Sequence, residues 1–173
     1  AEMHTLALDA ETAAFCAEWV QQHGATPRVR VALNTPEVQV QFAREHLRRI
    51  LVNLLDNAAR YASERAGAIQ VATHAVRHGP AVLMVWSDGA AMEPAVRRHL
   101  FEPFFSSESR SSGLGLFICR ELCERHGASI GYQRVAQATA AGPREGNAFT
   151  VHFRSAGRQS QSRSFPLFDA IVV

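Results

Sequence analysis

One amphipathic helix, predicted over residues 46–61, constrains the fold of this 173-residue chain more than any other segment. A second face of this helix carries Arg49, Asn53, Asn57 and Arg60, each three or four residues from the next. A solvated face more usually carries Glu and Lys, whereas two carboxamides beside a cation suit a metal ion and phosphates. The helix therefore predicts a nucleotide pocket beside a packed core. The core face has the i, i+3, i+4, i+7 spacing of apolar residues, namely Leu47, Ile50, Leu51, Leu54, Leu55 and Ala58.

A glycine-marked turn, Ser112-Gly113-Leu114-Gly115-Leu116, leads into a predicted helix over residues 114–126. Backbone N–H groups at a helix N-terminus can hold phosphate oxygens, and glycine lets the backbone approach a ligand closely. The alternative interpretation is an ordinary loop that ends at a helix. The preceding asparagine helix favours the phosphate interpretation.

These two segments and residues 101–105 (FEPFF) resemble three of the four sequence boxes of the ATP-binding domain of sensor histidine kinases, in the family's order. The resemblance covers about residues 5–155. Within the family the chain looks closest to proteobacterial kinases with a short lid, such as those controlling nitrogen regulation or type IV pili. It implies the Bergerat-type fold of gyrase, Hsp90, histidine kinases and MutL.

The expected fold class is α/β, a two-layer sandwich with one mixed sheet covered on one face by about three helices. The order of the predicted elements agrees with this class. Residues 1–155 are expected to form the catalytic domain and residues 156–173 a tail, polar at first and apolar over 165–173. That apolar segment is expected to pack on its own domain or on a neighbouring chain. Besides the two helices above, the patterns predict helices over 9–22 and from Pro94, and strands over 28–33, 38–42, 69–77, 81–86, 130–135 and 148–154.

The resemblance assigns catalytic roles to Asn53, Asn57 and Arg60. Asn57 would bind Mg²⁺ through its side-chain oxygen, with Asn53 beside it holding metal-bound water, and Arg60 would reach the phosphates of ATP. ATP-hydrolysing relatives tend to carry glutamate at the position of Asn53. Because an asparagine cannot take a proton, Asn53 favours transfer to another acceptor over hydrolysis. Tyr61 would stack on or edge the adenine, unless it simply closes the core.

The fourth box departs from the family pattern. Residues 87–91 (SDGAA) stand where the family carries Asp-x-Gly-x-Gly, so Ser87 replaces the aspartate that accepts the adenine amino hydrogen. Ala91 replaces the second glycine, and Ser111 replaces a glycine at the start of the last box. Asp88 would point to the opposite face of its strand unless a bulge re-aims it, in which case it could accept the bond that Ser87 must otherwise accept, directly or through water. Loss of a charge-assisted hydrogen bond costs roughly 1.5–3 kcal/mol, so weakened ATP binding is expected.

The full set of expected nucleotide contacts joins the helix, the fourth box and the lid. Phe105 is expected there as a lid anchor more than as a direct ligand, and Arg110 as a phosphate contact. The expected residues are Asn53, Asn57, Arg60, Tyr61, Ser87, Asp88, Gly89, Phe105, Arg110, Ser112, Gly113, Leu114, Gly115 and Leu116.

Charge and composition exclude several other classes. The formal net charge of +2 gives no nucleic-acid footprint. No apolar run approaches the ~18 residues of a membrane-spanning helix, and the first residues do not read as a signal peptide, so a soluble, cytoplasmic domain is expected. The three cysteines, Cys16, Cys119 and Cys123, give no even disulfide framework. Core packing is the favoured role for the latter two, over a metal or redox pair.

The partner expected from the resemblance is a phosphoacceptor dimerisation domain of the same protein. None of the eight histidines lies in the sequence context of a phosphoacceptor, so this chain resembles the catalytic part of a longer sensor. The expected function is transfer of the ATP γ-phosphoryl group to a histidine on that domain, and from there to a response regulator. The full-length protein is expected to be membrane-anchored and dimeric. The alternative is a degenerate kinase domain with weak or no ATP binding that acts as a regulatory or scaffolding module; a gyrase-like or chaperone-like ATPase is disfavoured by Asn53.

Overall fold

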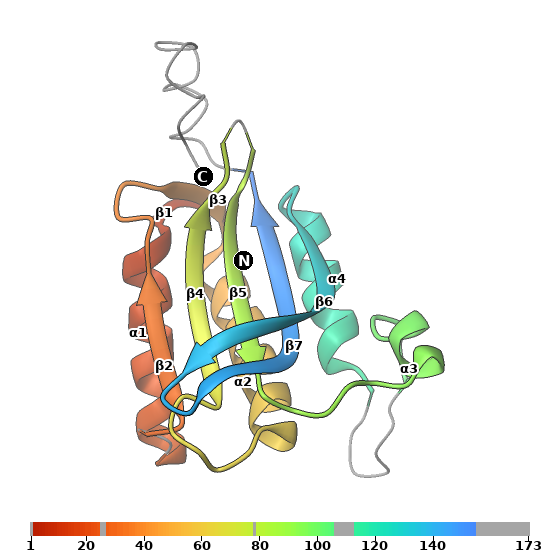
Figure 1. Cartoon of the computed structure of the whole chain (residues 1–173). Helices are drawn as coiled ribbons and strands as arrows, with labels where there is room; N and C mark the ends of the chain where they lie inside the picture. The colour runs from red at the N-terminus through yellow and green to blue at the C-terminus, as the bar shows by residue number, and fades with distance from the viewer. Residues whose placement is uncertain (1, 25–26, 78, 106–112, 155–173) are drawn as a thin grey trace.

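The computed structural model describes residues 2–24, 27–77, 79–105 and 113–154 of the chain. A five-stranded mixed sheet in the order β2-β4-β5-β7-β6 forms one layer, and α1, α2 and α4 cover one of its faces (Figure 1). The predicted two-layer α/β sandwich is therefore confirmed. The elements are β1 (His4–Ala7), α1 (Leu8–His23), β2 (Val29–Leu33), β3 (Gln39–Phe42), α2 (Arg44–Tyr61), β4 (Ile69–Ala75), β5 (Ala81–Ser87), α3 (Pro94–Arg98), α4 (Gly115–Arg125), β6 (Ser129–Thr139) and β7 (Gly142–Phe153).

Helix α2 lies at the centre of the helical layer and provides much of the core. The six apolar residues that predicted it are all buried, with side chains between 0 and 4% exposed. Full burial of one such leucine or isoleucine stabilises a fold by about 1.5–3 kcal/mol. Because the core face is fixed in this way, the polar face of α2 is turned away from the core.

The cysteines agree with a packing role. Cys16, Cys119 and Cys123 are free and buried, and burial raises the pKa of each thiol to about 12. Thiols that stay protonated at neutral pH are poor nucleophiles and poor metal ligands.

None of the helices in the described ranges has both the length and the hydrophobicity to cross a lipid bilayer.

Helix α1 begins without a capping side chain. Its N-cap is Ala7, and neither Asp9 nor Thr12 caps this end. The Asp9 carboxylate instead accepts hydrogen bonds from the Thr35 backbone N–H at 2.9 Å, the Thr35 hydroxyl at 2.6 Å and the Thr73 hydroxyl at 2.8 Å. Asp9 therefore connects α1 to the loop after β2 and to β4. Its three charge-assisted hydrogen bonds stabilise the fold more than a single capping bond would.

A second, small sheet was also missed. β1 pairs with β3 in antiparallel register, so the strand predicted over 38–42 joins this two-stranded sheet and not the main one. Leu6, Val40 and Phe42 are buried against the main core. These three side chains extend the main core to the two-stranded sheet.

The β6–β7 hairpin is longer than predicted and bends across the open face of the sheet (Figure 1). The Trp86 indole N–H donates to the Val135 carbonyl at 2.8 Å, and a small second core gathers Ala72, Met84 and Ala148 around Trp86. Gly146 permits this packing, because a Cβ there would overlap the Trp86 ring and the Ser87 carbonyl oxygen. The bend therefore covers part of the face that the helices leave open.

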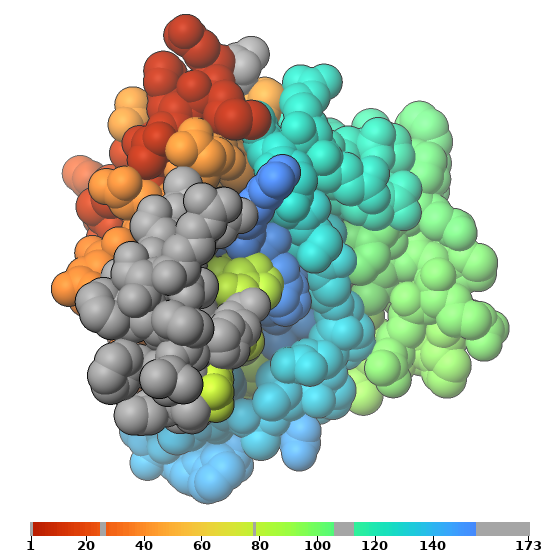
Figure 2. All heavy atoms as spheres, turned by 90° about the horizontal axis from the view of Figure 1, so that it is seen from above, coloured from red at the N-terminus to blue at the C-terminus, as the bar shows by residue number. Residues whose placement is uncertain are grey.

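The segment that carries α3 stands apart from the sheet. Figure 2 shows this segment (green) forming the side of the molecule opposite α1 (red), next to α4 and β6. Proline at the start of α3 fits its predicted position, because a first-turn residue needs no N–H partner within the helix.

Candidate functional site

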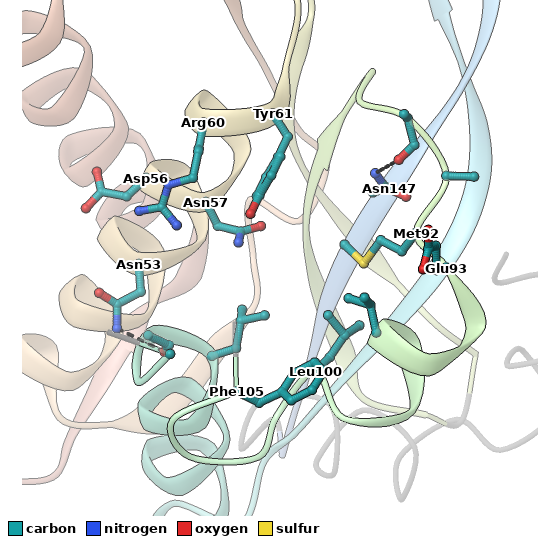
Figure 3. A pocket seen from close by; sticks show the side chains of 16 residues that line it. Asn53, Asp56, Asn57, Arg60, Tyr61, Met92, Glu93, Leu100, Phe105 and Asn147 are labelled. Atoms are coloured by element: carbon teal, nitrogen blue, oxygen red, sulfur yellow. Dashed lines mark hydrogen bonds between the residues drawn. The ribbon is translucent and has the colours of Figure 1, made fainter. Parts of the chain in front are cut away.

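A cavity of about 890 Å³ lies between α2 on one side and the segment from Ala90 to Phe105 on the other, with Asn147 of β7 at the sheet (Figure 3). This volume falls within the usual range for small-molecule sites. Eight of the expected contact residues line the cavity, namely Asn53, Asn57, Arg60, Tyr61, Phe105, Gly113, Gly115 and Leu116. The eight other lining residues are Asp56, Ala90, Ala91, Met92, Glu93, Val96, Leu100 and Asn147.

The polar wall of the cavity is one face of α2. The Asn53 carboxamide donates to the Gly115 carbonyl at 3.2 Å and so joins α2 to the start of α4. Asn57, one turn later, is half-buried, and its carboxamide makes no hydrogen bond to any residue within the described ranges. Figure 3 shows Asn57 and Arg60 on the cavity side of the helix. The wall therefore offers an amide oxygen and a cation to a ligand.

Asp56 also lies on this wall but is engaged with α1. Its carboxylate accepts a hydrogen bond from the Trp19 indole at 2.9 Å and lies 3.8 Å from His23. In Figure 3 its carboxylate points toward α1 and away from the centre of the cavity. Asp56 is therefore poorly placed to activate a water molecule near Asn53 and Asn57.

The glycine turn brings the N-terminus of α4 to the end of the cavity where the polar face of α2 lies. Gly113 has φ of 74°, in the left-handed region, and its carbonyl accepts a hydrogen bond from the Phe104 backbone N–H at 3.0 Å. Phe104 itself has φ of 63°, which is uncommon for a residue with a side chain. A helix N-terminus carries partial positive charge, so this end of the cavity favours an anion.

The opposite wall is mostly apolar. Ala90, Ala91, Met92, Val96 and Leu100 contribute small or flexible hydrophobic side chains to it. Such a wall suits a flat, weakly polar ring. One end of the cavity, made by α2 and α4, therefore suits phosphates and is called the phosphate-like end. The other end, made by this wall and the sheet, suits a base and is called the base-like end.

The fourth box does not supply the base-like end in the expected way. Ser87 is buried at 5% exposure and is absent from the cavity lining among the described residues, as are Gly89 and Leu114. The Asp88 carboxylate accepts from the Ser63 backbone N–H at 2.8 Å and the Ser63 hydroxyl at 2.6 Å, and Arg144 lies 3.5 Å away. Asp88 therefore points away from the cavity and holds the end of α2 to β5.

Two expected contacts, Arg110 and Ser112, lie outside the residues that the structure describes, as does the apolar segment 165–173.

Gly89 does not line the cavity, but it determines how closely the chain after β5 approaches α2. A Cβ there would come within 3.1 Å of the Tyr61 carbonyl oxygen, so glycine allows this chain segment to pass close to the end of α2.

Asn147 is the functional candidate that the sequence reasoning missed. Its side chain is only 4% exposed, it lines the cavity, and its residue pairs with Ser87 across β5 and β7. The signal was present but weak: in β7, position 147 shares the helix-facing side with Phe149 and Val151, so a polar residue there breaks an apolar pattern.

Residues 42–157 match the protein family described as "Histidine kinase-, DNA gyrase B-, and HSP90-like ATPase". The chain belongs to this family. The predicted family and the prediction of an ATP-binding domain are thereby confirmed. The polar α2 face and the glycine turn both lie within the matched range.

Curated relatives are sensor kinases. The chain is 35% identical over 109 residues to the sensor protein kinase PilS of Pseudomonas aeruginosa, covering 61% of this chain and 21% of PilS. It is 32% identical over 148 residues to the sensor protein CutS of Streptomyces coelicolor, covering 82% of this chain and 33% of CutS. The chain therefore spans about a fifth to a third of the length of these relatives. The chain is thus of the same type as the ATP-binding catalytic domain of sensor histidine kinases.

Solved structures agree on the fold. The mycobacterial sensor histidine kinase MprB has a TM-score of 0.71 at 23% identity, over 89% of this chain and 98% of that one. The catalytic domain of the histidine kinase ThkA has a TM-score of 0.70 at 20% identity, over 88% and 95% of the two chains. At these identities the likeness shows the fold alone.

Proposed function

We propose that this domain binds ATP together with Mg²⁺ and transfers the γ-phosphoryl group to a histidine on a dimerisation domain of the same protein. The observation that carries the proposal is the cavity itself: Asn53, Asn57 and Arg60 line one helix face opposite the N-terminus of α4. The sensor kinases PilS and CutS, which are longer than this chain, support it.

Asn57 is the residue best suited to Mg²⁺. This cation prefers oxygen ligands and retains several waters, and the carboxamide of Asn57 has no competing hydrogen bond in the described part of the chain. Bound Mg²⁺ would neutralise phosphate charge. Arg60 adds a second positive charge on the same wall, and the Asn53 bond to Gly115 keeps α2 and α4 in register around the phosphates.

Transfer is favoured over hydrolysis by what the α2 wall lacks. Asn53 cannot accept a proton, and the carboxylate of Asp56 is held by Trp19. No other carboxylate lies on the α2 side of the cavity among the described lining residues. Without a general base for water on this wall, the phosphoryl group is kept for an incoming histidine nitrogen.

The wider setting follows from the relatives and remains part of the proposal. We assign residues 1–155 to the catalytic domain and residues 156–173 to a tail. The phosphohistidine would supply a response regulator, and the full-length protein would be a membrane-anchored dimer with this domain in the cytoplasm.

A degenerate, regulatory domain is the second candidate, and one observation favours it. Ser87 replaces the expected carboxylate, and Asp88 is bonded to Ser63 outside the cavity. Loss of a charge-assisted hydrogen bond to the adenine would weaken binding roughly 10- to 150-fold.

Calorimetric titration with a non-hydrolysable ATP analogue, with and without Mg²⁺, separates these candidates. A micromolar Kd that depends on Mg²⁺ supports the kinase, whereas binding no tighter than millimolar supports the degenerate module. We expect Asn57→Ala to lose the Mg²⁺-dependent part of the affinity, roughly tenfold or more. Asn34→Ala is the matched control, because Asn34 bonds to the Thr73 carbonyl outside the cavity. An Asn57→Ala protein that keeps its Mg²⁺ dependence would contradict the assigned role.

A further inference from the structure

The base-like end of the cavity contains one deeply buried polar side chain, Asn147, at 4% exposure. We infer that Asn147 recognises the nucleotide base as a hydrogen-bond donor, in place of a carboxylate acceptor, so that the site accepts 6-oxo purines about as well as adenine. The inference deepens the proposed function and rests on nucleotide binding in this cavity.

The position of Asn147 follows from the strand register. Asn147 lies opposite Ser87 in the β5–β7 pair, and its side chain shares the helix-facing side of β7 with Phe149. The apolar wall with Met92 and Leu100 lies beside it (Figure 3). A base that packs on this wall, with its phosphates at the N-terminus of α4, would have its polar edge at the sheet, where Asn147 is buried.

The hydrogen bonds of Asn147 fix which end of its carboxamide is which. The Arg134 guanidinium can only donate, and it lies 3.1 Å from Oδ1. The Ala90 carbonyl can only accept, and it lies 2.9 Å from Nδ2 (Figure 3). The Tyr132 hydroxyl donates to Oδ1 at 2.5 Å. Burial raises the pKa of Tyr132, so this hydroxyl stays protonated at neutral pH.

With these hydrogen bonds made, the Asn147 carboxamide has one N–H left to donate and no acceptor site left on its oxygen. Both acceptor sites of Oδ1 are used, by Tyr132 and Arg134, whereas Nδ2 has a second N–H besides the one given to Ala90. The group that can meet a ligand is therefore an N–H.

No carboxylate among the described residues provides a buried acceptor at this end. Asp88 is bonded to Ser63, and Ser87 has a hydroxyl, which can donate or accept. Glu93 lines the cavity from the apolar wall but is exposed, so water competes for its carboxylate. A site of this kind cannot demand an amino group on the base.

The consequence for specificity follows from purine chemistry. Adenine offers a 6-amino donor beside an acceptor ring nitrogen, whereas hypoxanthine offers a 6-oxo acceptor. A carboxylate would bind only the former, and a site built around such a bond can reject the wrong base by roughly 10⁴-fold. An N–H donor is satisfied by an acceptor on either base. We therefore expect the Kd values for ATP and inosine triphosphate to differ by less than about tenfold.

The test is a titration of the chain with ATP and with inosine triphosphate, both with Mg²⁺. Asn147→Asp removes the donor and adds an acceptor with almost no change in size, so the ratio of the two Kd values should shift toward ATP by about tenfold or more. Asn34→Asp makes the same chemical change outside the cavity lining and should leave the ratio unchanged. Circular dichroism of each variant checks the fold.

A second variant keeps the test decisive if Asn147→Asp fails to fold. Ser87→Asp leaves Asn147 in place and extends an acceptor from the residue paired with it toward the base-like end, so it should also shift the ratio toward ATP. The inference is overturned if the wild-type chain prefers ATP by more than tenfold, or if the folded variant leaves the ratio unchanged; ATP binding would still support the proposed function. If neither nucleotide binds below millimolar concentration, the proposed function fails and the inference with it.

Discussion

Gly113 is the residue where the backbone geometry of the site can be tested most directly. Its φ of 74° lies in the left-handed region, and a Cβ added there would lie 2.6 Å from the Phe104 carbonyl carbon and 2.7 Å from the Phe105 backbone nitrogen. Both neighbours are backbone atoms, so they cannot rotate away as the end of a side chain can. Gly113→Ala must therefore move the chain where the glycine turn contacts the end of the preceding segment.

The expected loss of stability has two parts. The left-handed conformation costs a residue with a Cβ about 1–2 kcal/mol. Overpacking against fixed neighbours costs about 1–3 kcal/mol. Partial relaxation reduces the sum, so we expect Gly113→Ala to lower the free energy of unfolding by about 2–4 kcal/mol. In a domain of this size that corresponds to a decrease in Tm of roughly 5–15 °C.

Gly115 provides the matched control two residues away. It also lines the cavity, but it starts α4, and a Cβ there would meet no atom within 4 Å. Gly115→Ala should therefore leave stability unchanged or raise it by up to about 1 kcal/mol, because alanine favours the helix. Thermal unfolding followed by circular dichroism compares the two variants. If Gly113→Ala melts within 1–2 °C of the wild type (roughly the shift from half a kcal/mol), the close contact between residues 104 and 113 does not exist in solution.

Two further outcomes test other parts of the structure. Asp88→Ala should lower the free energy of unfolding by about 1.5–3 kcal/mol in urea, because it removes charge-assisted bonds to Ser63, yet change the Kd for ATP less than threefold; tenfold weaker binding would place Asp88 in the site. His46 and His126 are joined at 2.8 Å, and burial lowers the pKa of both below the ordinary value of 6.5. Because their folded-state pKa values are lowered, the stability they contribute is present above pH 6.5 and is lost as pH falls below it. The decrease in Tm between pH 7.5 and pH 5 should be smaller in His46→Gln, and an equal decrease in both proteins would refute this coupling.

The phosphate-like end of the cavity was predictable because local sequence patterns in α2 and in the glycine turn before α4 specify it. In α2 the apolar spacing fixes which face enters the core, and the same 3.6-residue period then fixes where Asn53, Asn57 and Arg60 point. No long-range contact needs to be known for that step. The sheet and its covering helices followed in the same way from periodicity and element order.

The base end was not predictable on the same grounds. Asn147 and Ser87 are sixty residues apart in sequence, and only the register of β5 against β7 brings them together. Residues near Gly142 and Gly146 have the composition of a loop, which is why the predicted hairpin strands were too short. Likewise β1 has four residues, too few for an alternating pattern to distinguish it from a loop.

The bent hairpin connects the two faces of the sheet to this end of the site. β6 supplies both Tyr132 and Arg134, which hold the oxygen of Asn147 on the cavity side. The carbonyl of the very next residue, Val135, accepts a hydrogen bond from the Trp86 indole N–H on the opposite face. Since Gly146 lets the Trp86 ring lie against β7, the packing of the small open-face core fixes the strand that carries Asn147. The position of Asn147 therefore depends on side chains outside the described cavity lining, whereas the other end of the cavity is built from α2 and the turn before α4.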